Sequence, residues 1–178
     1  MVHSRLTTRE VGEVRMDFEI VLLRGNSSSG KTTIARRLQT ELDNVILISQ
    51  DVIRRDMLQE SDRIGRDTMR IIEAMIIAAR QMDRLIILEG IFRKDIYGNW
   101  LAELSEQYAV SAWYFDASLR TTKARHEARE QSKQYPSEIL ERWYRPHDII
   151  IQLNETLIPE TWSEQTTVDK ILQDISGK

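Results

Sequence analysis

Residues 25–32 read Gly-Asn-Ser-Ser-Ser-Gly-Lys-Thr and fit the spacing G-x-x-x-x-G-K-[ST] at every fixed position. An apolar run precedes them at 18–23, and a helix-like run follows at 32–39. This strand–loop–helix context is the one that the motif requires. In such a loop, consecutive backbone N–H groups converge on phosphate oxygens, and the following helix adds the positive end of its dipole. The stretch therefore predicts a site for a nucleoside triphosphate.

The two residues at the end of the motif carry distinct chemistry. Lys31 is expected to reach the terminal phosphates as a point charge, and the Thr32 hydroxyl is expected to hold Mg²⁺. An unrelated turn rich in Gly and Ser is the other interpretation, but the two glycines, the Lys, the Thr and the flanking pattern all argue against it. The expected nucleotide-binding residues are Gly25, Asn26, Ser27, Ser28, Ser29, Gly30, Lys31, Thr32 and Thr33.

Short apolar runs alternate with helical patterns along the rest of the chain. After the first strand come apolar runs at 45–48, 85–88 and 110–115, and 156–158 is a possible fifth strand. Helical spacing predicts helices over 31–42, 52–58, 68–81, 95–107, 118–131, 137–144 and 166–175. This alternation predicts an α/β fold, in which a parallel sheet with right-handed crossovers carries a layer of helices on each side.

Composition limits the class of protein. The 178 residues suit a single domain, here 18–178, with residues 1–17 as a polar lead-in or a short extra element. The absence of cysteine excludes disulfides, thiolate metal sites and a cysteine nucleophile. No apolar run reaches the roughly 20 residues of a membrane span, and the N-terminus lacks the apolar core of a secretory signal. We therefore expect a cytoplasmic protein with no membrane partner.

Polar residues follow the predicted strands, at the edge where ligands bind to parallel sheets. Asp51 follows the second strand and is a candidate general base for phosphoryl transfer to a hydroxyl, or an N-cap of the next helix. Arg54 lies three residues later and could neutralise a transferring oxygen or pair with Asp51. Glu89 closes the third strand and could bind Mg²⁺ or make a structural hydrogen bond. Asp116 closes the fourth and could simply cap the following helix.

Arg125 and Arg129 are one turn apart on a charged helix, so that they could close over a triphosphate as part of a lid spanning about 118–146. The alternative is an exposed helix whose arginines pair with nearby glutamates. His126 is expected at the surface without a role. Several further residues could line an acceptor pocket or could be packing and surface residues, namely Arg63, Arg66, Arg93, Trp143, Tyr144, Arg145 and His147.

These motifs together resemble the small P-loop kinases that phosphorylate metabolites, antibiotics or nucleic-acid ends. The likeness is greatest to the branch of chloramphenicol phosphotransferase, zeta toxin and polynucleotide kinase. It rests on 25–32, on the D-x-x-R element at 51–54 and on the R-x-x-x-R element at 125–129. The resemblance implies a P-loop NTPase fold with strand order 2-3-1-4-5, ATP and Mg²⁺, an Asp51 base and lid arginines on the phosphates. It also implies that the loop near Pro159 and Glu160 lies beside the adenine. Glu89 departs from the family, where many relatives have Asp.

The preferred hypothesis is an ATP-dependent kinase that acts on a hydroxyl of a small molecule. A 5′-hydroxyl kinase of RNA or DNA is an alternative, which the net charge of −3 argues against. A nucleotide-binding switch without an acceptor is a third hypothesis, and the pairing of Asp51 with Arg54 argues against it. The sequence identifies neither the acceptor nor the oligomeric state.

Overall fold

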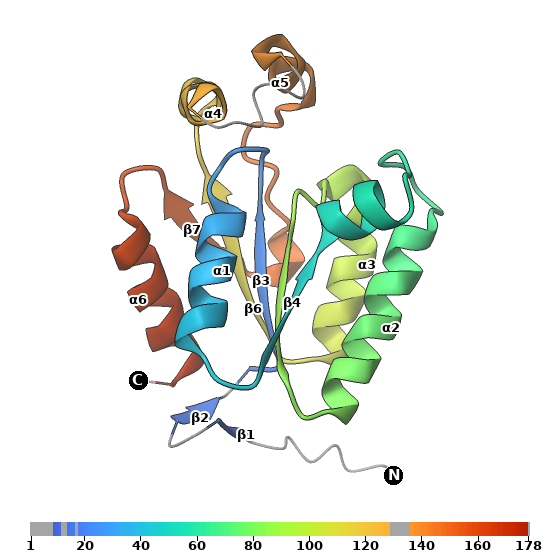
Figure 1. Cartoon of the computed structure of the whole chain (residues 1–178), viewed down its shortest axis with the longest axis vertical. Coiled ribbons are helices and arrows are strands. Elements are labelled where there is room, and N and C mark those ends of the chain that lie inside the picture. The colour runs from blue at the N-terminus through green and yellow to red at the C-terminus, as the bar shows by residue number, and fades with distance from the viewer. Residues whose placement is uncertain (1–8, 12–13, 17, 129–135, 178) are drawn as a thin grey trace.

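A computed structural model describes residues 9–11, 14–16, 18–128 and 136–177. Its centre is a sheet of five parallel strands in the spatial order β4 (Val45–Ser49), β5 (Leu85–Gly90), β3 (Ile20–Gly25), β6 (Val110–Asp116) and β7 (Thr156–Pro159) (Figure 1). Counted along the chain, this is the order 2-3-1-4-5, which confirms the predicted fold class. Within the polar lead-in, β1 (Arg9–Val11) and β2 (Val14–Met16) form a separate antiparallel pair.

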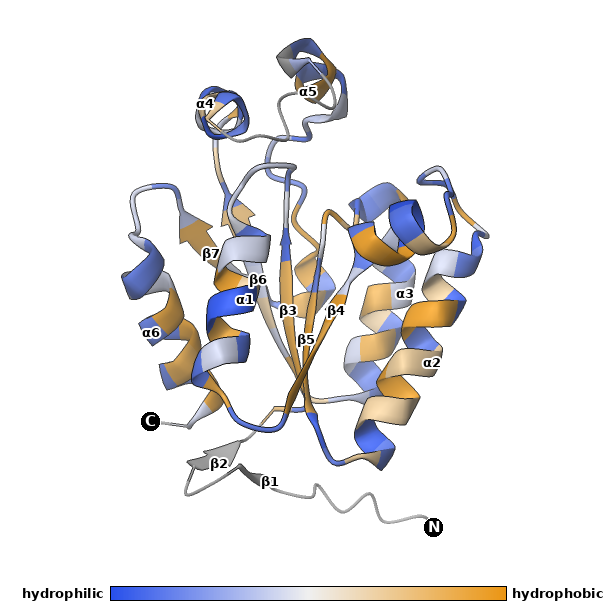
Figure 2. Ribbon diagram, viewed as in Figure 1, coloured by the Kyte–Doolittle hydropathy of each residue, from blue (hydrophilic) through white to orange (hydrophobic). Residues whose placement is uncertain are grey.

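Helices cover both faces of the sheet. On one face lie α1 (Lys31–Glu41) and α6 (Glu164–Ile175), and on the other lie α2 (Asp67–Gln81) and α3 (Lys94–Gln107) (Figure 1). The central strand β3 serves both cores, because alternate residues of a strand point to opposite faces. Val21 and Leu23 pack with α1 and α6, whereas Ile20 and Leu22 pack with α2 and α3. The apolar sides of the helices accordingly face the sheet (Figure 2).

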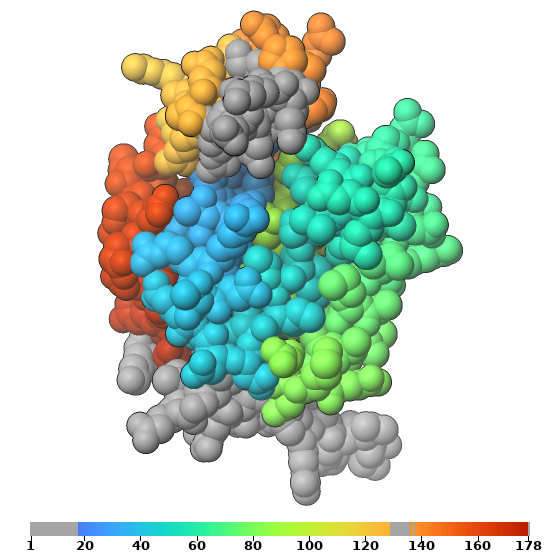
Figure 3. Space-filling model, viewed as in Figure 1, coloured from blue at the N-terminus to red at the C-terminus, as the bar shows by residue number. Residues whose placement is uncertain are grey.

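Two further helices, α4 (Leu119–Glu127) and α5 (Ser137–Trp143), pack against each other beyond the carboxyl ends of the strands (Figure 1). In the space-filling view they appear in yellow and orange above α1, with the teal residues that follow β4 to one side (Figure 3). Both lie within the segment predicted as a lid.

Several local details differ from the sequence-based expectations. The segment after β4 is a π-helical turn, η1 (Val52–Met57), rather than an α-helix, and a 3₁₀ turn, η3 (Ile151–Leu153), precedes β7. Helix α6 begins two residues earlier than predicted, because the Ser163 hydroxyl accepts the Thr166 N–H and caps the helix. Among the described residues, no helix has both the length and the apolar character needed to cross a bilayer.

Candidate active site

The predicted phosphate loop joins β3 to α1 and turns sharply at its two glycines. Gly25 has a φ of 146° and Gly30 a φ of 111°, both in the region that favours glycine. A Cβ at position 25 would lie only 2.9 Å from the Cβ and the carbonyl oxygen of Phe115. The spacing of the motif is therefore explained by backbone geometry as well as by close packing against β6.

Lys31 is the first residue of α1 and is 6% exposed. Its Nζ donates to the Asn26 carbonyl oxygen at 2.8 Å and lies 3.5 Å from the Ser29 hydroxyl oxygen. The ammonium group is thus held over the loop by the loop's own oxygens. A phosphate entering the loop would replace these weaker acceptors with a charged one.

Thr32, in the first turn of α1, lies beside Glu89, near the end of β5. The Thr32 hydroxyl donates to Glu89 Oε2 at 3.2 Å, and the Ser49 hydroxyl donates to Glu89 Oε1. Glu89 is 3% exposed, so its carboxylate is held in place by two hydroxyls from the neighbouring loop and strand. The structural hydrogen bond considered for Glu89 is present. The same group of oxygens fits Mg²⁺, which binds carboxylate, hydroxyl, phosphate and water oxygens.

Asp51 follows β4, and its carboxylate is held by arginines. Asp51 Oδ1 accepts from Arg54 Nη2 at 2.8 Å and lies 3.3 Å from Arg55 Nε. Arg54 also donates from Nη1 to the Glu60 carbonyl oxygen at 3.1 Å, which fixes its guanidinium. Within residues 18–128 the Asp51 side chain makes no capping hydrogen bond to the following turn. The structure thus shows the Asp51–Arg54 pair, and the catalytic role of each stays a prediction.

A cavity of about 350 Å³ borders these arginines. Its lining residues are Arg54, Arg55, Ser61, Asp62, Ile91, Arg93 and Trp143. Of the residues expected near an acceptor, Arg93 and Trp143 line this cavity, whereas Arg63 and Arg66 are exposed outside it. Tyr144 instead bonds the Ala117 carbonyl oxygen, and His147 pairs with Asp116 at 3.0 Å.

A second cavity, of about 280 Å³, is lined in part by Ser29 and Gly30 of the phosphate loop. Pro159 and Glu160 line it, as does Trp162, together with residues of the loop and of α4. Arg125 lines it too, and its Nη1 donates to the Ser29 carbonyl oxygen at 2.6 Å. Arg125 therefore reaches the phosphate loop, while Arg129 lies outside the described residues. The binding of a triphosphate by these arginines stays a prediction.

His126 was expected at the surface, and this expectation is wrong, because the residue is 1% exposed. It shares one face of α4 with Thr122, four residues earlier and equally buried, and α5 packs against this helix. The highly charged sequence around His126 gave no sign that one face of α4 is covered.

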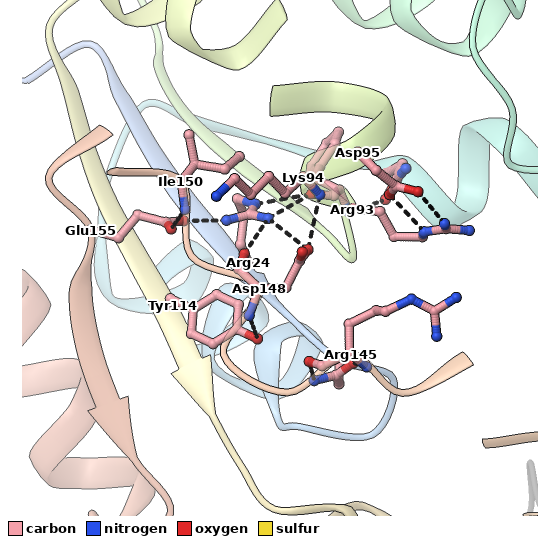
Figure 4. A network of polar contacts seen from close by, with 12 residues as sticks. Arg24, Arg93, Lys94, Asp95, Tyr114, Arg145, Asp148, Ile150 and Glu155 are labelled. Carbon is pink, nitrogen blue, oxygen red and sulfur yellow. Dashed lines mark hydrogen bonds and ion pairs between the residues drawn. The ribbon is translucent and has the colours of Figure 1, made fainter. Parts of the chain in front are cut away.

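Sequence reasoning missed the anchoring contacts of two residues, Asn26 and Arg24. The Asn26 side chain donates to the Arg145 carbonyl oxygen at 2.7 Å and accepts the Arg145 N–H at 2.9 Å. Arg24, the last residue before the loop motif, is fully buried. Its Nη1 donates to Glu155 at 2.6 Å, and its Nη2 donates to the Phe92 carbonyl oxygen at 2.7 Å and to Asp148 (Figure 4). The only sequence signal was an arginine at the end of an otherwise apolar strand.

Gln50 contacts Phe92, whose carbonyl oxygen accepts a hydrogen bond from Arg24. Its Oε1 accepts the Phe92 N–H at 3.1 Å, which stabilises the left-handed φ of 42° at that residue. Nearby, the Tyr97 hydroxyl donates to Asp62 at 2.5 Å, and burial raises the pKa of this phenol. Phe92 lies between two residues that line the larger cavity, Ile91 and Arg93, so these contacts fix one wall of it.

Comparison with known proteins agrees with this geometry. Residues 20–145 match the AAA domain family. The chain belongs to this family. A search of curated proteins finds no match.

Solved structures with the same fold include a gluconokinase from Sinorhizobium meliloti 1021, with a TM-score of 0.64 and 13% identity over 88% of this chain and 91% of that one. A shikimate kinase from Acinetobacter baumannii, solved with shikimate, has a TM-score of 0.57 and 19% identity over 89% and 93%. A chain of the Pnkp1/Rnl/Hen1 RNA repair complex has a TM-score of 0.56 and 20% identity. The matched region spans 77% of this chain but only 44% of that longer chain. The domain thus has the P-loop kinase fold.

Proposed function

We propose that this AAA domain is an ATP-dependent kinase that transfers the γ-phosphoryl group to a hydroxyl of a small molecule. The observation that carries the proposal is a pair of cavities, one lined by residues of the phosphate loop and the other by the arginines that hold Asp51. Arg125 lines the first, and the arginine partners of Asp51 line the second. A binding switch would need only the first cavity.

The nucleotide would occupy the cavity that contains Pro159, Glu160 and Trp162. The loop amides and Lys31 would hold the β- and γ-phosphates, and Arg125 would exchange the Ser29 carbonyl oxygen for a phosphate oxygen. Thr32 and Glu89 would hold Mg²⁺, which when bound neutralises charge on the phosphate oxygens.

The acceptor would enter from the cavity beside Arg54 and Arg55. Its hydroxyl oxygen attacks the γ-phosphorus, the bond from that phosphorus to the β–γ bridging oxygen breaks, and ADP leaves with the electron pair. The hydroxyl proton passes to Asp51. Both arginine contacts are to Oδ1 of this carboxylate, which leaves Oδ2 to receive the proton.

The proposal is tested by measuring transfer of labelled phosphate from ATP to a panel of sugars, sugar acids, cyclitols and nucleosides. Gluconate and shikimate belong in the panel because proteins named for them share the fold. A 5′-hydroxyl oligonucleotide at low salt serves as the nucleic-acid arm. Transfer to the oligonucleotide alone, or to no acceptor while ATP still binds, would overturn the proposal.

A pair of variants tests the base. Removing a general base lowers the rate by about 10²- to 10⁴-fold, so Asp51→Asn should lose transfer while ATP binding persists. Asp56→Asn is the matched control, because Asp56 is an exposed acid on the same π-helical turn. Full activity in Asp51→Asn would remove Asp51 from the mechanism.

A further inference from the structure

The cavity beside Asp51 carries an excess of positive side chains. Arg54 and Arg55 reach it from η1, and Arg93 reaches it from the residue before α3, whereas Asp62 is the one acid among the lining residues described. The Asp62 carboxylate is already engaged by the Tyr97 hydroxyl. The lining therefore offers three guanidinium groups against a single carboxylate.

These arginines differ in the contacts that they make within the protein. Arg54 donates to Asp51 and to the Glu60 carbonyl oxygen, and its side chain is only 12% exposed. Its buried Nε has no hydrogen-bond partner among the described residues. Arg55 contacts Asp51 through Nε alone, which leaves its two terminal nitrogens as donors within the described structure. A single carboxylate oxygen thus serves two arginines on this side of the cavity.

Arg93 is paired with a carboxylate that faces solvent. Its Nε and Nη2 donate to Asp95, whose side chain is 62% exposed. The remaining terminal nitrogen of Arg93, Nη1, is a further donor within the described structure. Arg55 can bind an oxyanion through two parallel hydrogen bonds from its terminal nitrogens, and Arg93 can add one from Nη1.

The remaining wall of the cavity is apolar and aromatic. Trp143 is 44% exposed, and the Arg55 guanidinium lies 6.0 Å from the centre of its ring. Ile91 completes this surface. A volume of about 350 Å³ is at the lower end of ligand pockets, which span roughly 300–1,000 Å³, so the space suits a small molecule rather than a polymer.

We propose that the acceptor is a small hydroxylated molecule with a carboxylate or phosphate group, whose oxyanion is bound by Arg55 and Arg93 while its carbon skeleton packs on Trp143. This inference rests on the kinase function proposed above. The two anion types share the chemistry that an arginine fork recognises, and the experiment below separates them.

The test compares acceptors in pairs in which one member carries the anionic group and the other lacks its charge. Shikimate is measured against its methyl ester, gluconate against sorbitol, and glucose 6-phosphate against glucose. Because a charge-assisted hydrogen bond changes affinity by about tenfold or more, the charged member should be preferred by at least that factor. The first two pairs report on a carboxylate and the third on a phosphate.

Arg93→Gln should reduce this preference, because it removes one of the two guanidinium groups without touching Asp51. The matched control is Arg63→Gln, since Arg63 is exposed and outside the cavity. The KM for ATP should be unchanged in both. Equal use of charged and neutral acceptors by the unmodified protein, or a preference that is undiminished in Arg93→Gln, would overturn the inference while leaving the kinase proposal in place.

Binding can also be followed without turnover. Trp143 lines the acceptor cavity and is one of four tryptophans in the chain, so its contribution to the emission is obtained as the difference between the unmodified protein and Trp143→Phe. Addition of the charged acceptors should change the emission of Trp143, and Trp143→Phe should remove that signal. Anion-specific binding without phosphoryl transfer would support this inference and count against the kinase. Absence of any anion-dependent signal in a protein that phosphorylates neutral acceptors would overturn it.

Discussion

Asn26 and Arg145 exchange two hydrogen bonds, one from the amide group of Asn26 to the Arg145 carbonyl oxygen and one from the Arg145 N–H to the Asn26 side-chain oxygen. Asn26 belongs to the phosphate loop and is 7% exposed. Arg145 follows Trp143, which lines the acceptor cavity, by two residues. The loop that would hold the phosphates is thereby joined directly to the segment that carries one wall of the acceptor cavity.

Asn26→Ala removes both of these bonds while leaving the loop backbone intact. A pair of buried hydrogen bonds is worth about 1–3 kcal/mol, so the acceptor KM should rise about tenfold. The KM for ATP should change much less, since the loop binds phosphate through its backbone. Steady-state kinetics in both substrates check this, with Asn99→Ala, an exposed residue of α3, as the control. An equal rise in both KM values would contradict the specific link to the acceptor side.

Glu89→Gln removes the charge of the carboxylate that contacts Thr32 and Ser49. Loss of a group that holds or orients a metal typically weakens metal affinity by 10- to 100-fold, and we expect a shift of about this size in the Mg²⁺ concentration that half-saturates ATP binding. Titration of Mg²⁺ against Trp162 emission measures it without turnover. An unchanged Mg²⁺ requirement would leave Glu89 with only the structural role of its hydrogen bonds.

Gly90→Ala should disturb the residues beside Asp51. A Cβ at position 90 would lie 2.5 Å from Gln50 Oε1 and 2.7 Å from the ring of Phe92, closer than real contacts allow. We expect a loss of roughly 1–3 kcal/mol in the free energy of unfolding, as for other overpacked sites, together with reduced transfer.

Gly98→Ala is the matched control for this change. Gly98 lies within α3, and a Cβ there would meet only Lys94 at an ordinary 3.5 Å. Alanine in a helix interior is favoured over glycine by about 1 kcal/mol, so this variant should be neutral or more stable in urea unfolding. Similar losses in both variants would show that the packing around Gly90 is not the cause.

Removing Arg24 should destabilise the fold by leaving Glu155 without its partner. The Glu155 side chain is 0% exposed and bonds Arg24 at 2.6 Å. Breaking a buried ion pair from one side costs about 3–5 kcal/mol, which is the loss expected for Arg24→Met in chemical denaturation. Arg24→Met combined with Glu155→Gln should recover part of it. No recovery in the double variant would assign the loss to the bonds with Phe92 and Asp148.

Alkaline pH should weaken the fold through Tyr114. Burial raises the pKa of this phenol from 10.0 to about 12. Above pH 10 the unfolded chain releases this proton while the folded chain keeps it, so stability falls as pH rises between about 10 and 12. Tyr114→Phe should reduce the slope of unfolding free energy against pH in this range. Some slope should remain, because burial also raises the pKa of Tyr97. An unchanged slope would exclude Tyr114 as its source.

The sequence patterns were sufficient to predict a parallel sheet and the residues that meet at its carboxyl edge, because alternating apolar runs and helices force parallel strands to end on one side. Thr32 and Glu89 meet for this reason, although 57 residues separate them. The order of the strands was implied only by the resemblance to the P-loop kinases.

Contacts that depend on long-range side-chain partners were not predictable. Nothing in a single sequence indicates that Asn26 pairs with the backbone at 145, or that Arg24 finds its carboxylate at 155. The expectation that His126 is exposed failed for a related reason, because its helix α4 packs against a different helix, α5. The π-helical turn after Asp51 was also not predicted, since its residues show ordinary helical spacing.

The bond from Arg125 to the Ser29 carbonyl oxygen and the pair between Asn26 and Arg145 join both ends of the segment predicted as a lid to the same short loop. If the proposed kinase admits ATP and releases ADP past these contacts, the rate of turnover would depend on how often they open. Substitutions at these contacts would then change the turnover rate without changing the reaction.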